Sequence, residues 1–157
     1  MDYRVAAGVR LDGFLRGQIE KIAAFFRKST GSCLLVTDGI RSTAEQARII
    51  YRLVADGNDL SIYRRCDLAV ELLAAYQTAG DSKAEKLEAI RLALERQASR
   101  GGYISRHLQG LAVDIRCRDM SAVERELFRS FAERLADKVI EESTPPHFHL
   151  EFERVSD

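Results

Sequence analysis

Histidine is scarce in this chain, and its three copies stand where they could act together. They are His107, His147 and His149, and the last two belong to one tripeptide. Side chains two positions apart on a β-strand point to the same face, about 6 to 7 Å apart along it. His147 and His149 can therefore face one site while Phe148 points into the core. Paired imidazoles in such a place could bind a metal ion or transfer protons.

Asp114 can add a carboxylate to the same site. It follows His107 by seven residues, an odd separation that would put the two on opposite faces of a continuous strand. Gly110 permits a bend between them, so we expect His107 on a loop and Asp114 on a strand. Two imidazoles and one carboxylate are a normal ligand set for a catalytic zinc, which keeps one position for water.

Other interpretations of these residues stay open. Taken singly, each histidine is more often an ordinary loop or strand residue than a ligand. A structural zinc would want a closed site, usually with cysteine. Cys33, Cys66 and Cys117 show neither paired nor CxxC spacing, which indicates reduced thiols. A closed site could be formed by His107 and His149 with two cysteines. The distances along the sequence between these residues do not match a typical zinc-site spacing.

Length and composition exclude several classes of protein. The 157 residues are 46% apolar and 31% charged, which predicts one compact domain over residues 1–157. The 24 basic residues are balanced by 24 acidic ones, so a nucleic-acid partner is not expected. Neither a secretory h-region nor an apolar run of about 18 residues occurs, so we expect a cytoplasmic protein without a membrane partner. Oligomeric state has no signature in the sequence.

Apolar spacing predicts alternating helices and strands. Strands are expected over residues 33–37, 110–116 and 147–152, with 138–141 as a further candidate. Helices are expected over residues 11–28, about 43–57, 67–78, 82–99 and 121–136. This order predicts an α+β domain whose small, largely antiparallel sheet carries the site and is flanked by helices.

Three motifs in this order resemble a known family. Residues 105–114, SRHLQGLAVD, match S-x-H-x-x-G-x-A-x-D, and residues 147–149 match the H-x-H that follows it. Residues 37–42, TDGIRS, with Gln46 are similar to an S-G-Y-R-S element and its glutamine, with Asp38 in place of the serine. The chain thus resembles the zinc D-Ala-D-Ala metallopeptidases, whose superfamily joins lysostaphin-type enzymes, D-alanyl-D-alanine carboxypeptidases and dipeptidases, phage endolysins and the hedgehog signalling domain.

The resemblance implies a ligand set. It assigns zinc to His107, Asp114 and His149, the second histidine of the pair. Glu151 matches an acidic position often found after that last ligand. It could orient an imidazole or balance the metal charge, or be an ordinary charged residue on a strand.

Three further residues could hold a substrate. Arg41 has a planar guanidinium that can bind a substrate carboxylate or a developing oxyanion. Gln46 and Ser105 could hydrogen-bond substrate amides, although a cap or turn role explains either equally well.

The general base has two candidates. Relatives commonly carry a glutamate three residues before the last zinc ligand, and Pro146 stands there in this chain. His147 is favoured because it shares a strand face with His149. Glu142 is the alternative, as in the hedgehog-like branch, but it precedes His147 by five residues across two prolines.

Together these residues predict a zinc peptidase that cleaves an amide bond beside a D-amino acid in peptidoglycan stem peptides. Without a signal peptide it would suit a phage lysis enzyme, or a cytosolic peptidase acting on cell-wall fragments. The alternative is a recognition module of the same fold with little or no catalysis, with or without bound metal. A cupin-type H-x-H site is disfavoured because cupins are β-barrels and this chain is rich in helices.

Overall fold

The computed structural model describes residues 1–154 and is an α+β fold, as predicted. The strands are β1 (Tyr3–Val5), β2 (Leu34–Asp38), β3 (Ala112–Arg116), β4 (Lys138–Ser143) and β5 (Pro146–Glu151). The helices are α1 (Gly13–Thr30), α2 (Thr43–Ala55), α3 (Cys66–Thr78), α4 (Lys83–Ser99) and α5 (Ala122–Ala132), with a 3-10 turn η1 (Arg106–Gln109).

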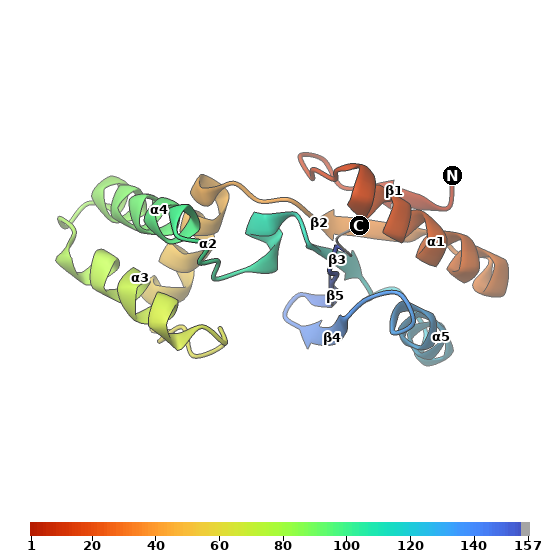
Figure 1. The fold of residues 1–157 in the computed structure, drawn as a ribbon. Coiled ribbons are helices and arrows are strands. Elements are labelled where there is room, and N and C mark those ends of the chain that lie inside the picture. The colour runs from red at the N-terminus through yellow and green to blue at the C-terminus, as the bar shows by residue number, and fades with distance from the viewer. Residues whose placement is uncertain (155–157) are drawn as a thin grey trace. The chain divides into compact units, whose positions relative to one another are not determined.

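The chain divides into two compact units. One contains Met1–Ile40 and the chain from Gly110 onward, and the other is Arg41–Gln109. Figure 1 shows the sheet with α1 and α5 in the first unit and α2, α3 and α4 in the second. The expectation of one metallopeptidase-like domain over residues 1–157 stays a prediction.

The sheet is small and largely antiparallel, as expected. Its strand order is β1-β2-β3-β5-β4. β1 and β2 run parallel, and the other neighbouring pairs are antiparallel. β1 was not predicted, because three residues are too few to show an alternating pattern. β4 continues two residues beyond the expected range, to Ser143.

One face of the sheet carries the core of the strand unit. Val113 and Ile115 of β3 and Phe148 and Leu150 of β5 are fully buried against α1 and α5, which lie on the same side of the sheet (Figure 1). Full burial of one such side chain stabilises the fold by about 1.5–3 kcal/mol. Because side chains alternate along a strand, the intervening residues project from the opposite face. That face carries Asp114 and both histidines of β5.

α1 shows how the spacing of apolar residues predicts a helix. Its buried residues Leu15, Ile19, Ile22 and Phe26 recur at steps of three and four, the period of an α-helix. The helix ends at Thr30 and is capped by Gly31, whose φ of 78° is the left-handed conformation that glycine adopts at little cost. α5 is shorter than expected and stops at Ala132, because the next residues form turns that lead into β4.

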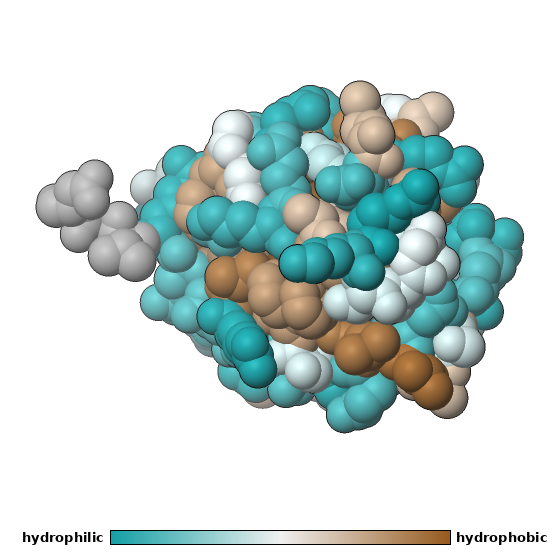
Figure 2. Space-filling model, turned by 90° about the vertical axis from the view of Figure 1, so that its right-hand side faces the viewer, coloured by the Kyte–Doolittle hydropathy of each residue, from teal (hydrophilic) through white to brown (hydrophobic). Residues whose placement is uncertain are grey.

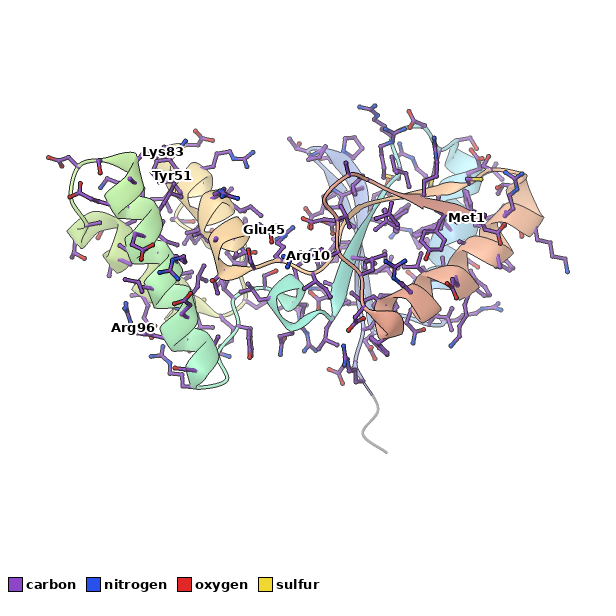
Figure 3. All side chains as sticks on the ribbon, turned by 90° about the horizontal axis from the view of Figure 1, so that it is seen from above. Met1, Arg10, Glu45, Tyr51, Lys83 and Arg96 are labelled. Carbon is purple, nitrogen blue, oxygen red and sulfur yellow. The ribbon has the colours of Figure 1, made fainter. Side chains whose placement is uncertain are left out.

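The helical unit has a core of its own. Ile50 of α2, Leu72 of α3, and Ile90 and Leu94 of α4 are buried together. α2 and α4 each begin with a complete capping box, formed in α2 by Ser42 and Glu45. Lys83 of α4 stands over the ring of Tyr51 of α2, 5.6 Å from its centroid (Figure 3). The packed helices fix the start of α2, and Arg41 lies directly before Ser42, the N-cap of this helix.

The surface mixes hydrophobic and hydrophilic side chains. The face drawn in Figure 2 carries several hydrophobic residues among hydrophilic ones, as folded proteins commonly do. Val123 and Ile62 are among the exposed examples. Within residues 1–154, no helix combines the length and the apolar character that crossing a bilayer would need.

Candidate metal centre

Asp114 and His149 meet across two neighbouring strands. They are direct partners in the antiparallel register of β3 and β5. Asp114 Oδ1 lies 2.9 Å from His149 Nδ1. Because the alternate residues of both strands are packed into the core, the two side chains are held on the opposite face of the sheet. The strand register therefore aligns one carboxylate with one imidazole.

His107 lies on η1, and the bend expected at Gly110 is present. Gly110 has a φ of 66°, in the left-handed region, and β3 begins two residues later. The side chain of His107 is buried, and the backbone N–H of His107 donates to Ser105 Oγ at 3.3 Å. Asp114 lies on a strand, as predicted, whereas His107 lies on the short 3-10 helix η1 where a loop was expected.

The three predicted ligands are close enough to bind one metal ion. One ligand atom from each of His107, Asp114 and His149 lies within 4.8 Å of the others. Two ligands of a single ion at metal distances of 2.0–2.3 Å are at most roughly 4–5 Å apart. His107 and Asp114 are buried and His149 is largely so, which restricts the access of water to the cluster. The donor set of two nitrogens and one oxygen suits zinc and other borderline cations.

Glu151 contacts the second ring nitrogen of His149. Its Oε1 lies 3.1 Å from His149 Nε2 and 3.4 Å from Lys138 Nζ. A carboxylate that accepts the second N–H of a metal-binding histidine fixes the tautomer and the orientation of the ring. Of the two roles considered for Glu151, this contact favours the orienting one.

The metal-free cluster shifts the pKa values of both partners. Burial lowers the pKa of His149, but the hydrogen bonds and charges of Asp114 and Glu151 outweigh it and raise that pKa to about 9. The hydrogen bond from His149 lowers the pKa of Glu151 to about 2, against the effect of its own burial. The metal-free protein thus holds a protonated imidazole between two carboxylates.

This charge arrangement predicts a pH dependence for the metal-free protein. A raised pKa means that His149 stabilises the fold fully below its ordinary value of 6.5, and that this is lost as the pH rises through about 9. Glu151 stabilises the fold fully above its ordinary value of 4.5, and this is lost as the pH falls toward about 2. Both contributions are complete between these ordinary values. Thermal unfolding in chelator should therefore show a lower melting temperature at about pH 9.5 than at about pH 6.

The variant Glu151→Gln provides the control for this pH dependence. Removing that carboxylate should lower the pKa of His149, which NMR titration of the imidazole measures directly, and should reduce the difference in melting temperature. An imidazole that titrates near 6.5 in both proteins would contradict the arrangement.

The two candidate bases lie side by side. Glu142 of β4 is the direct register partner of His147 of β5, and Glu142 Oε2 is 3.4 Å from His147 Nε2. His147 Nε2 is also 3.8 Å from Asp114 Oδ1, and its Nδ1 is 2.6 Å from the carbonyl oxygen of Pro145. Glu142 and His147 are five residues apart across two prolines, but the hairpin between β4 and β5 brings them side by side. His147 and Glu142 therefore form one pair beside Asp114.

The predicted substrate residues are linked within the helical unit. Arg41 Nη1 donates to Gln46 Oε1 at 3.0 Å, and the backbone N–H of Arg41 donates to the carbonyl of His107 at 3.1 Å. Gln46 is buried, and its Nε2 donates to Tyr63 Oη at 3.3 Å. Tyr63 was not predicted, since it lies in a segment between helices without apolar periodicity. The buried amide holds the Arg41 guanidinium in one orientation.

No protein-family model, no curated protein and no solved structure matches this chain.

Proposed function

We propose that the protein is a zinc-dependent peptidase that hydrolyses an amide bond beside a D-amino acid in peptidoglycan stem peptides. The observation that carries the proposal is the convergence of His107, Asp114 and His149 within 4.8 Å. His107 and Asp114 come from one motif and His149 from a second, and the two motifs occur in the order typical of zinc D-Ala-D-Ala metallopeptidases. The resemblance supplies the reaction and the substrate class, and the clustered ligands support the metal centre that this reaction needs.

The residues present fit a zinc ion. His107, Asp114 and His149 would hold it, with His149 using the nitrogen that faces Asp114 and Glu151 retaining the other. Zinc in a three-ligand site supplies Lewis-acid polarisation of a carbonyl and makes water more acidic. Three protein ligands rather than four are typical of catalytic and not of structural zinc.

His147 and Glu142 provide the proton transfer that amide hydrolysis needs. An imidazole can accept a proton from the attacking water and donate it to the leaving amine. Glu142, 3.4 Å from the His147 ring, can orient that ring and stabilise its protonated form. The pair replaces the glutamate that relatives carry at the position of Pro146.

Arg41 would bind the substrate carboxylate or the oxyanion that develops during hydrolysis. Arg41→Lys is expected to lower kcat/KM by at least roughly tenfold, because lysine cannot form a bidentate contact. The melting temperature should stay nearly unchanged. The matched control is Arg48→Lys, which makes the same substitution at an exposed position of α2. Equal kinetics in the two variants would make Arg41 an ordinary surface residue.

A second candidate function is a metal-binding recognition module of the same fold. Pro146 favours it, because proline offers no group that could act as a base. Mass spectrometry of stem peptides incubated with the zinc-loaded protein distinguishes the two. The peptidase yields a product that chelator abolishes, whereas the module binds zinc and leaves the peptide intact.

A further inference from the structure

Strand β4 carries a lysine beside the carboxylate that contacts His149. Lys138 Nζ lies 3.4 Å from Glu151 Oε1, and the same oxygen lies 3.1 Å from His149 Nε2. We infer that Lys138 is a positioning residue of the metal centre, which fixes the carboxylate of Glu151 and through it the ring of His149. The inference rests on the metal ligands of the proposed function and not on its peptidase activity.

The register between β4 and β5 produces this contact. Alternate residues of β4 are the direct partners of the three β5 residues on the metal-site face, in the pairs Lys138 with Glu151, Ile140 with His149, and Glu142 with His147. Directly paired side chains of an antiparallel sheet lie on the same face and interact. β4 therefore places a positive charge beside the carboxylate that contacts a metal ligand, and a negative charge beside the candidate base.

Glu151 needs a partner to keep its carboxylate in place. A glutamate side chain has several rotatable bonds, and holding it in one orientation costs conformational entropy. Its neighbour on β3 is Ala112, whose methyl group forms no hydrogen bond. The ammonium of Lys138 donates to the carboxylate instead. Because the two side chains are only 25% and 21% exposed, water and salt screen this ion pair less than a fully exposed one.

The orientation of His149 determines which ring nitrogen the metal can use. Nδ1 faces Asp114, and Nε2 faces Glu151. A ring that donates its proton from Nε2 to Glu151 keeps Nδ1 as the nitrogen for the metal. Loss of such a partner of a ligand typically costs 10- to 100-fold in metal affinity. Lys138 acts one contact further from the metal, so we expect an effect at the lower end of this range.

The charge of Lys138 alone acts in the opposite direction. A cation close to the site repels a divalent metal ion, so removal of this charge by itself would strengthen zinc binding. A fall in zinc affinity after removal of the lysine therefore identifies the contact with Glu151 as its cause.

Competition with a chromophoric chelator, at one fixed pH, measures the zinc dissociation constant of each variant. Lys138→Met keeps most of the apolar stem and removes the ammonium, and it should weaken zinc binding roughly tenfold. Lys138→Arg keeps a cation within reach of Glu151 and should bind zinc nearly as tightly as the native chain. In a Glu151→Ala background, Lys138→Met should not weaken zinc binding further, because no carboxylate remains to be held.

The exposed Lys21 of α1 provides the control, since Lys21→Met makes the same substitution outside the sheet. This variant should bind zinc as the native chain does. Circular dichroism establishes that each variant is folded.

The imidazole N–H of His149 gives a readout that a purely structural role of Lys138 would not change. In the zinc-loaded native chain and in Lys138→Arg, the Nε2 proton should give a resolved NMR signal, because Glu151 protects it from exchange with water. In Lys138→Met this signal should broaden as the carboxylate becomes free to turn away.

Zinc binding by Lys138→Met that is as tight as that of the native chain, or tighter, would overturn the inference. An equal loss of affinity with and without the carboxylate of Glu151 would also overturn it. A zinc-loaded native chain that leaves stem peptides intact would count against the proposed function alone, because these measurements need no turnover.

Discussion

Alanine at His149 or at Asp114 is expected to remove the bound metal and to lower stem-peptide hydrolysis by more than about 100-fold. Loss of an outer-shell partner of a metal site typically costs 10- to 100-fold, and loss of a ligand removes more. The two side chains are 2.9 Å apart and share one cluster with His107. Elemental analysis should find about one zinc per native chain and much less in either variant.

The control for this prediction is Asp81→Ala, at an exposed aspartate in the turn before α4. It should keep both metal and turnover. Circular dichroism at the assay temperature establishes that each variant is folded. Full zinc content in His149→Ala and in Asp114→Ala would remove both residues from the ligand set.

Alanine at His147 is expected to leave the metal in place and to lower kcat by roughly 100-fold or more, the usual scale for loss of a general acid-base group. The three ligands do not include His147, so zinc content should match that of the native chain. Glu142→Gln should cost much less, because glutamine at that position still contacts the His147 ring and the imidazole stays in place. Stopped assays on a stem peptide at saturating concentration measure both values.

The opposite result would reverse the assignment. If Glu142→Gln abolishes turnover while His147→Ala keeps most of it, Glu142 is the base and the arrangement matches the hedgehog-like branch. If neither change affects turnover, the proton is transferred by another group altogether.

Local patterns in the sequence predict most of the helices and strands of the fold. The buried positions of α1 repeat at helical steps, and β5 alternates Phe148 and Leu150 in the core with His147 and His149 on the other face. Such periods arise within one element and need no knowledge of its neighbours. β1 lacks this signal because only Tyr3 of its three residues is buried.

The candidate site was predictable where one bend or one strand decides the placement. The left-handed Gly110 separates His107 from Asp114 as expected. The contact between Glu142 and His147 depends on the register of a hairpin, which the spacing of residues across two prolines does not specify. Tyr63 accepts a hydrogen bond from Gln46 because the folded helical unit brings the two together. The residues around Tyr63 in the sequence contain no pattern that predicts this contact.

Hydrolysis of a stem pentapeptide by the native chain, with zinc and with chelator, tests the central claim most directly. Mass spectrometry should show a new product in the presence of zinc. Chelator should abolish this product, and it should return when zinc is restored in excess. The mass of the product also identifies the bond that is cleaved. A zinc-loaded, folded chain that leaves the peptide intact would contradict the assignment as a peptidase, and cleavage that persists in chelator would contradict the role of the metal.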